Sequence, residues 1–400
     1  MAVSKRIERT ETAYIDVVID QYASGEGNSK PVVMAMGSSH WGPPLEALED
    51  LRPFMADMSV NKYGSITGLP SLKEEWIRQL IKHGYGIDEG EEMTLNRFCE
   101  FAELAVTVGA QQAFFSLSLI LCDQEDEAVL LAPYYFSHKL ALQIAGLSPS
   151  NIRVCPFEEE TMKTNWKELE KLIARRPKMV VLTSPNNPSG AVYTKDEMLR
   201  IVELCRSAET WLVIDETYYE FLYNEAGHYF ITQNDYENVC HILSMSKSFG
   251  MPGWRVGALT FPLKLSEAFR KIQDTNPTHT CVLSQHLALQ CLKHDHKYAF
   301  VKSKIEELDS VRNMLWEVLA PLGMKIKPAG SFYFLIPLPK EITEDQAIDI
   351  LAKQFKVLLL HGWIFGAPGY LRLSYGCLPP ETAKAQVENV GAGFKYLYSM

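Results

Sequence analysis

Residues 239–261, VCHILSMSKSFGMPGWRVGALTF, contain two apolar runs with the composition of buried strands. Only the eight residues 247–254 separate these runs, and Gly250, Pro252 and Gly253 are among them. A parallel pair of strands needs a crossover of a dozen or more residues, whereas a short loop can join an antiparallel pair. The stretch therefore predicts two antiparallel strands that lie side by side.

Five further apolar runs precede this stretch, and most are continuously hydrophobic rather than alternating. Such runs are typical of strands that are buried on both faces of a sheet. Helical patterns fall between most of them, as in residues 110–122 and 195–208. We therefore predict an α/β fold whose large domain has a mostly parallel seven-stranded sheet flanked by helices. The seven runs occupy residues 105–108, 127–133, 151–157, 178–185, 210–216, 239–246 and 255–261.

The pattern changes after about residue 285, where long helical stretches lead into short strands and a final amphipathic helix. This change predicts a second, smaller α+β domain. We expect a large cofactor-binding domain over residues 46–284. The small domain would combine residues 285–400 with the N-terminal segment 1–45.

The composition favours a globular protein without a nucleic-acid or membrane partner. The 400 residues are 47% hydrophobic and 22% charged, and the formal net charge is −10, which argues against nucleic-acid binding. No apolar stretch is long enough to span a membrane, and residues 1–20 lack the apolar core of a secretory signal. The eight cysteines are scattered without metal-binding spacing. We expect them to be buried free thiols and the protein to be cytoplasmic.

Residues with chemical potential follow several of the predicted strands. In open α/β sheets, ligands bind beyond the carboxyl ends of the strands, so these residues would meet at one edge. Each has an ordinary explanation as well: a tight turn, ring packing, turn chemistry or helix capping. The candidates are Gly109, Ala110 and Gln111 after the first strand, Tyr135 after the second, Asn187 after the fourth, Asp215 with Tyr218 after the fifth, and Ser246 with Lys247 after the sixth.

One small molecule would use all of these groups together. Pyridoxal phosphate has an aldehyde that reacts with a lysine amine and a pyridine nitrogen that a carboxylate keeps protonated. Its phosphate would be bound by serine hydroxyls, an arginine and a helix N-terminus. We infer that this cofactor binds at the strand ends.

From about residue 30 to residue 400, the chain resembles the class I and II aminotransferases of the fold-type I pyridoxal-phosphate enzymes. The motifs that carry the resemblance are SPNNPSG at 184–190, DETYYEF at 215–221, SMSKSFGMPGWRVG at 244–257 and YLRLSYG at 370–376. Their order and spacing match those of the family.

The resemblance implies a role for each candidate residue. Lys247 would form the Schiff base and move the substrate α-proton, Asp215 would pair with the pyridine nitrogen, and Arg372 would bind the substrate α-carboxylate. The remaining cofactor ligands would be Asn187 and Tyr218 at the 3′-oxygen, Tyr135 against the ring, and Gly109, Ala110, Gln111, Ser244, Ser246 and Arg255 at the phosphate.

Tyr63 and Gly37 also match the family, whereas Trp41 lies in SSHWGPPLEAL, a stretch that departs from the family's usual opening. Tyr63, in NKYGSITGLPSL, corresponds to a tyrosine that reaches the phosphate of the neighbouring subunit, which implies a homodimer with shared active sites. Gly37 falls where the N-terminal segment lines the substrate pocket, and Asn187 would reach this pocket too. Trp41 resembles a feature of the plant-type enzymes that transaminate aromatic amino acids and methionine. Core packing explains Trp41 equally well.

These matches favour an aminotransferase that moves the amino group of an aromatic amino acid or methionine to a 2-oxo acid by a ping-pong mechanism. A lyase on the same scaffold, catalysing carbon–sulfur β-elimination or forming a cyclopropane, is an alternative because the motifs do not separate the two reactions. A regulator that keeps the fold as a sensor is a third possibility. We expect no metal.

Overall fold

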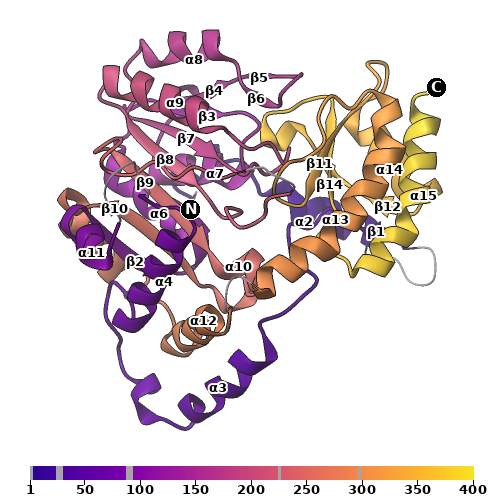
Figure 1. Ribbon diagram of the computed structural model, residues 1–400. Coiled ribbons are helices and arrows are strands. Elements are labelled where there is room, and N and C mark those ends of the chain that lie inside the picture. The colour runs from indigo at the N-terminus through magenta and orange to yellow at the C-terminus, as the bar shows by residue number, and fades with distance from the viewer. Residues whose placement is uncertain (1–2, 24–29, 87–92, 224–226, 296–298) are drawn as a thin grey trace.

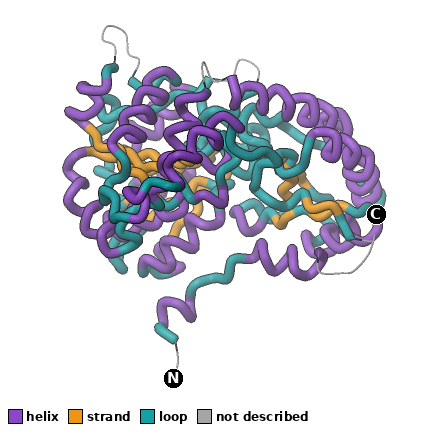
Figure 2. Tube along the Cα trace, turned by 90° about the horizontal axis from the view of Figure 1, so that it is seen from below, coloured by secondary structure: helices purple, strands orange, loops and turns teal. Residues whose placement is uncertain are grey.

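A seven-stranded sheet forms the centre of the larger part of the molecule. The computed structural model describes residues 3–23, 30–86, 93–223, 227–295 and 299–400. In Figure 2 the strands gather in two groups, each surrounded by helices. The larger group has the strand order β2-β10-β9-β8-β7-β3-β4. Its strands are β2 (Ala102–Thr107), β3 (Ala128–Leu131), β4 (Ile152–Cys155), β7 (Met179–Thr183), β8 (Trp211–Asp215), β9 (Val239–Ser244) and β10 (Gly257–Pro262).

The direction of the strands confirms the prediction from the short loop. Strand β10 runs antiparallel to both of its neighbours, with Gly257 opposite Ser244 of β9 and opposite Thr107 of β2. The other neighbouring pairs in this sheet are parallel. All seven predicted runs are strands of this one sheet.

Helices cover both faces of the sheet, as the apolar stripes of the sequence predict. The stripes of 110–122 and 195–208 are buried against opposite faces. One face packs on α6 (Gly109–Leu121), α7 (Phe136–Ala145) and α11 (Ser266–Thr275), and the other packs on α8 (Trp166–Ile173) and α9 (Lys195–Ser207). Around β2 and β10 the cover is α3 (Leu45–Met55), α4 (Pro70–Lys82) and α12 (Val282–His294).

The smaller part is built on a second, antiparallel sheet with the order β11-β14-β13. Strands β1 and β12 pair in parallel beside it, so that the N-terminal segment joins the C-terminal part of the chain. Figure 1 shows α13, α14 and α15 around these strands. The elements are β1 (Val32–Val33), β11 (Tyr333–Pro337), β12 (Val357–Leu358), β13 (Leu360–His361), β14 (Tyr370–Ser374), α13 (Ala299–Leu319), α14 (Glu344–Gln354) and α15 (Pro380–Leu397).

The predicted α/β fold with a smaller α+β part is confirmed. The exact domain division stays a prediction, and a boundary at residue 284 would fall inside α12, which packs on α3 and α4. The other elements are α1 (Lys5–Arg9), α2 (Tyr14–Ala23), α5 (Leu95–Phe101), α10 (Met245–Ser248), β5 (Phe157–Glu158), β6 (Lys163–Thr164), and the 3₁₀ helices η1 (Met58–Asn61), η2 (Pro149–Asn151), η3 (Pro252–Trp254), η4 (Leu263–Leu265), η6 (Ala320–Leu322) and η7 (Trp363–Phe365).

Two sequence expectations about the surface can be compared with the structure. The cysteines are free, but Cys99 and Cys281 are exposed and Cys377 is partly buried, so the expectation that all are buried was wrong for these three. These residues lie near helix ends or in a loop, where an apolar run does not guarantee cover. Across the described residues, every helix is too short or too polar to cross a membrane.

Candidate active site

A cavity of about 310 Å³ lies where the carboxyl ends of the parallel strands meet the second sheet. Strand β2 leads into α6, β8 ends at Asp215, and β9 leads into α10, so each connection delivers side chains to this edge. The cavity brings together most of the residues selected from the sequence. Those that line it are Gly37, Ala110, Gln111, Tyr135, Asn187, Asp215, Tyr218, Ser244, Ser246, Lys247, Arg255 and Arg372.

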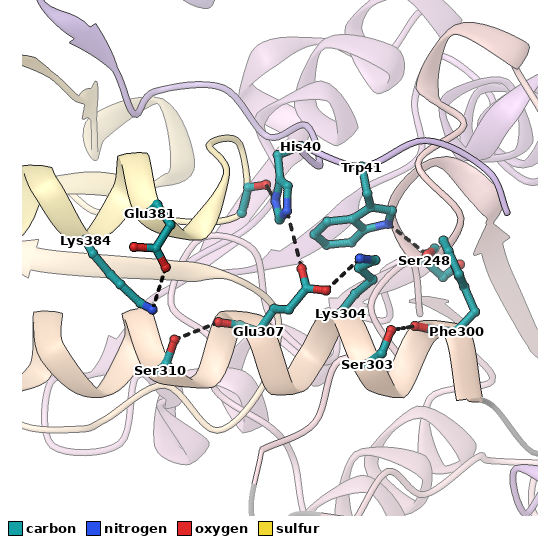
Figure 3. Close-up of polar contacts among 11 residues, drawn as sticks. His40, Trp41, Ser248, Phe300, Ser303, Lys304, Glu307, Ser310, Glu381 and Lys384 are labelled. Atoms are coloured by element: carbon teal, nitrogen blue, oxygen red, sulfur yellow. Dashed lines mark hydrogen bonds and ion pairs between the residues drawn. The ribbon is translucent and has the colours of Figure 1, made fainter. Parts of the chain in front are cut away.

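Trp41 is outside this cavity and packs in the core instead. It is 9% exposed, stacks on Phe221 with ring centroids 6.1 Å apart, and donates a hydrogen bond from Nε1 to the carbonyl oxygen of Ser248 at 3.0 Å. Figure 3 shows its indole turned toward Ser248, while the neighbouring His40 points to Glu307 of α13. The packing alternative therefore describes Trp41, and a direct contact with substrate has no support from its position.

Gly109 and Tyr63 also lie outside the cavity lining, for different reasons. Gly109 begins α6 directly beneath Arg255, where a Cβ atom would lie 2.7 Å from Nη2 of that arginine. Tyr63 is 90% exposed and meets the edge of His279 at 6.0 Å. An aromatic ring so open to solvent is free for contact with another subunit.

Lys247 lies on the short helix α10, immediately after the buried strand β9. The side chain of Ser244 caps this helix by accepting a hydrogen bond from the Ser246 amide at 3.1 Å. The Lys247 ammonium donates to the carbonyl oxygen of Gly37. Burial, followed by the positive charges of Arg372 and Arg255, lowers the pKa of Lys247 to about 8, although Asp215 opposes this effect. A lysine with this pKa is close to the neutral form that a nucleophile needs.

Asp215 ends strand β8 and is held by two neighbours. Its Oδ2 lies 3.0 Å from Nε2 of His138, and its Oδ1 accepts hydrogen bonds from the Thr217 amide at 3.0 Å and the Thr217 hydroxyl at 2.7 Å. Burial raises the pKa of the carboxyl, but the bonds from His138 and Thr217 outweigh burial and hold it below its ordinary value. Asp215 is therefore ionised and can pair with a cation in the cavity.

The start of α6 and Arg255 form one positively polarised end of the cavity. Gly109 adopts a φ of +75°, which glycine tolerates. Gly257 of β10 packs against it so closely that a Cβ atom on residue 257 would lie 2.6 Å from the carbonyl carbon of Gly109. Arg255 has a φ of +56°, in the left-handed region that non-glycine residues rarely occupy. Its Nη1 donates to the Pro252 carbonyl oxygen at 3.0 Å. Helix N-termini with an arginine nearby bind phosphate groups.

Arg372 lies in the middle of β14 and is almost fully buried at 1% exposure. Its Cζ is 4.7 Å from the ring centroids of both Tyr333 and Phe365, so the guanidinium is held by two aromatic rings. Nη1 donates to Oδ1 of Asn187 at 3.0 Å, and Nε has no hydrogen-bond partner among the described residues. No carboxylate of the described chain forms an ion pair with it. A buried cation in this state is ready to bind an anionic ligand.

Sequence reasoning missed several residues that line this cavity, and His138 and Tyr333 are the two that bear most on its chemistry. His138 lies on α7, about one helical turn after Tyr135. The helical spacing therefore places it on the same side as Tyr135, where it contacts the carboxylate of Asp215. The apolar run SFYFLIPL around Tyr333 indicates a strand and nothing more. Tyr333 lines the cavity because β11 pairs with β14, a long-range contact that carried no signal in the sequence.

The charges of the cavity fit pyridoxal phosphate and an amino acid. Among the described residues that line it, Lys247, Arg255 and Arg372 are cationic, and Asp215 is the carboxylate. A phosphate suits the end with α6 and Arg255, and a substrate carboxylate suits Arg372, whose Nε is unsatisfied among the described residues. Asp215 suits a protonated ring nitrogen, which a carboxylate stabilises.

Comparison with known proteins identifies the family. Residues 33–390 match the model of the aminotransferases of class I and II. The chain is 31% identical to aromatic aminotransferase ISS1 of Arabidopsis thaliana, over 92% of this chain and 91% of that protein, and 29% identical to an aspartate aminotransferase of Pyrococcus abyssi, over 94% of each. The crystal structure of Thermus thermophilus aspartate aminotransferase with maleate superposes with a TM-score of 0.87 at 26% identity, covering 98% of this chain and 100% of that one. The chain therefore belongs to the class I and II aminotransferases, enzymes that depend on pyridoxal phosphate.

Proposed function

We propose that this aminotransferase transfers the amino group of an aromatic amino acid or methionine to a 2-oxo acid in two successive half-reactions. The observation that carries the proposal is the charge and polarity of the cavity lining. Each of the three cations among the described lining residues has a role with the cofactor or the α-carboxylate, so none of these three remains for a second substrate carboxylate. Ile15, Met36 and Phe136 line the same cavity and favour an apolar side chain.

The proposed roles follow from the positions of the side chains. Arg372 binds the α-carboxylate through its free Nε and one Nη, and this contact fixes the Cα–H bond relative to Lys247. Nζ of Lys247, with a pKa near 8, accepts the α-proton and returns it. When bound, the cofactor supplies an electron sink that lowers the barrier to removing this proton. Asp215 keeps the electron sink effective by pairing with the ring nitrogen.

The remaining site residues have supporting roles in this proposal. Tyr135 would pack against the ring, and Asn187 and Tyr218, which line the same cavity, would bind the 3′-oxygen. Residues 109–111, with Ser244, Ser246 and Arg255, bind the phosphate. Tyr63 would complete this phosphate site from a second copy of the chain in a homodimer, which its 90% exposure supports. A cytoplasmic location and the absence of a nucleic-acid partner stay predictions.

The related proteins support transfer of an amino group but carry different substrate names. They include aromatic, aspartate and aspartate/prephenate aminotransferases. The lyase alternative is not favoured, because these relatives are named aminotransferases.

A panel of amino donors tests the proposed substrate class. Reconstituted enzyme is offered phenylalanine, tyrosine, methionine and aspartate, first without an acceptor and then with several 2-oxo acids. We expect kcat/KM for phenylalanine or methionine to exceed that for aspartate by more than about tenfold, since a buried unpaired carboxylate costs several kcal/mol. Higher kcat/KM with aspartate would contradict the proposal. Pyruvate and ammonia released without an acceptor would indicate elimination instead.

A further inference from the structure

Two buried tyrosine hydroxyls meet at the wall of the cavity. Oη of Tyr218 and Oη of Tyr333 are 2.5 Å apart, and the side chains are 3% and 0% exposed. Tyr218 comes from the segment after β8, whereas Tyr333 begins β11 of the second sheet. The contact therefore joins the two sheets directly at the active site.

Tyr333 is held in place from three directions. Leu335, two residues further along β11, pairs with Arg372 of β14, so Tyr333 and Arg372 share one face of the sheet. The guanidinium of Arg372 then packs on the Tyr333 ring, with Cζ 4.7 Å from the centroid. Gly37 passes so close that a Cβ atom there would lie 2.7 Å from Oη of Tyr333. These contacts fix the position of the Tyr333 hydroxyl next to that of Tyr218.

If Tyr218 is to donate a hydrogen bond to a ligand, Tyr333 must be the donor within the pair. Each hydroxyl has one proton to donate. If Tyr333 donates to Tyr218, the proton of Tyr218 remains free to point into the cavity, and a hydroxyl that accepts a hydrogen bond becomes a stronger donor. Burial, the largest influence, raises the pKa of Tyr218 well above its ordinary value, so it stays protonated.

We propose that Tyr333 is a positioning residue of the reaction, whose hydroxyl orients Tyr218 and strengthens its hydrogen bond to the 3′-oxygen of pyridoxal phosphate. The inference rests on the proposed role of Tyr218 at that oxygen. A hydrogen bond to the 3′-oxygen would reduce the negative charge on that oxygen, so that it would hold the proton on the nearby nitrogen of Lys247 less strongly and this proton would be lost more easily. Tyr333 therefore lowers the pKa of that nitrogen through Tyr218.

Replacing Tyr333 by phenylalanine leaves the charged and titratable groups around Tyr218 and Tyr333 in the protein. Arg372 of β14, Tyr135 before α7 and Cys377 after β14 face the two hydroxyls. Arg372, Arg255 and Asp215 face Lys247. Tyr333→Phe removes one oxygen atom and keeps the ring that Arg372 packs on.

The test measures the pKa of the Lys247 nitrogen in its covalent complex with the cofactor, rather than turnover. Reconstituted protein is titrated while its visible absorption band is followed. We expect Tyr333→Phe to raise this pKa by about 0.3–1 unit and Tyr218→Phe to raise it by more, as a weakened and a lost hydrogen bond should. In the double variant the pKa should equal that of Tyr218→Phe alone.

Tyr375→Phe is the matched control, because Tyr375 is equally buried and its hydroxyl donates to the Ser331 carbonyl oxygen, away from the cavity lining. This control should leave the pKa of the cofactor-bound Lys247 nitrogen unchanged. An unchanged pKa in Tyr333→Phe would overturn the proposal, as would an equal rise in the presence and absence of the Tyr218 hydroxyl. A raised KM for the amino acid with an unchanged pKa would assign Tyr333 to Arg372 instead.

A second variant covers the case in which Tyr333→Phe does not fold. Gly37→Ala keeps both tyrosine side chains, but its Cβ atom would displace the hydroxyl of Tyr333. We expect this variant also to raise the pKa of the cofactor-bound Lys247 nitrogen. The absorption band also separates the two proposals. Protein that forms the band but transaminates no aromatic donor contradicts the proposed substrate class and leaves the role of Tyr333 testable.

Discussion

Replacing Lys247 by methionine should stabilise the cofactor-free protein while abolishing transamination. The pKa of Lys247 lies at about 8 rather than at its ordinary value of 10.5, because burial and two arginines disfavour its charged form. A pKa difference of about 2.5 at about 1.4 kcal/mol per unit gives about 3.5 kcal/mol of destabilisation near neutral pH. Methionine has a similar length and no charge, so the substitution removes this destabilisation.

Two corrections reduce the expected gain. The residue is only partly buried, so solvent screens part of the charge, and methionine loses the hydrogen bond to Gly37, which contributes about 1 kcal/mol. We expect Lys247→Met to raise the free energy of unfolding by about 2 kcal/mol at about pH 7.

The gain should depend on pH with a definite sign. Below about pH 8 the lysine is protonated in the folded and unfolded states, and the folded state carries the full unfavourable charge. Between about pH 8 and pH 10.5 the folded protein has lost this proton while the unfolded chain keeps it, so wild-type stability recovers as the pH rises. Near pH 9.5 the advantage of methionine should therefore fall to about zero.

Urea unfolding of both cofactor-free proteins at these two pH values, at equal protein concentration, measures the effect. Lys167→Met, an exposed change on α8, is the control and should alter stability by less than about 0.5 kcal/mol at either pH. A Lys247→Met protein that is less stable than wild type near pH 7, or an advantage that does not shrink at the higher pH, would refute the reasoning.

Three further substitutions test other parts of the site. Arg372→Lys should lower kcat/KM for amino-acid donors by about 30–1000-fold in steady-state assays, because a lysine cannot replace two parallel charge-assisted hydrogen bonds; a loss below about threefold would contradict carboxylate binding there. His138→Asn should weaken cofactor affinity by about tenfold in equilibrium titrations, since Asp215 loses its bond to Nε2; unchanged affinity would mean that Thr217 alone suffices. Gly109→Ala should weaken affinity for pyridoxal phosphate by about tenfold or more, since its Cβ atom would meet Arg255 and its φ of +75° disfavours alanine; wild-type affinity would show that the helix start can adapt.

Much of the large sheet could be predicted from the sequence because strands buried on both faces leave continuous apolar runs. The eight-residue loop also fixed the direction of β10, since chain length alone rules out a crossover. Candidate ligands could then be selected at the strand ends without knowing any contact. These inferences depend on local composition and on the geometry of parallel sheets.

The missed features depend on long-range packing. Tyr333 stands in the continuous apolar run of an ordinary buried strand, and only pairing between β11 and β14 turns it toward Arg372. Trp41 follows three small or polar residues and a histidine, a pattern that does not indicate which way its indole points. Its orientation is set by Ser248 and Phe221, which lie far away in the sequence.

The pairing of β1 with β12 has a consequence for protein synthesis. Residues 32–33 find their strand partners only at 357–358, and the carbonyl oxygens of Met34 and Ala35 accept hydrogen bonds from Ser374 and Arg372. The wall of the site near Gly37 therefore cannot form until residues 357–374 have left the ribosome. A nascent chain that already contains Lys247 and Asp215 still lacks Arg372, the arginine proposed to bind the substrate carboxylate, so on this proposal substrate recognition is acquired late in synthesis.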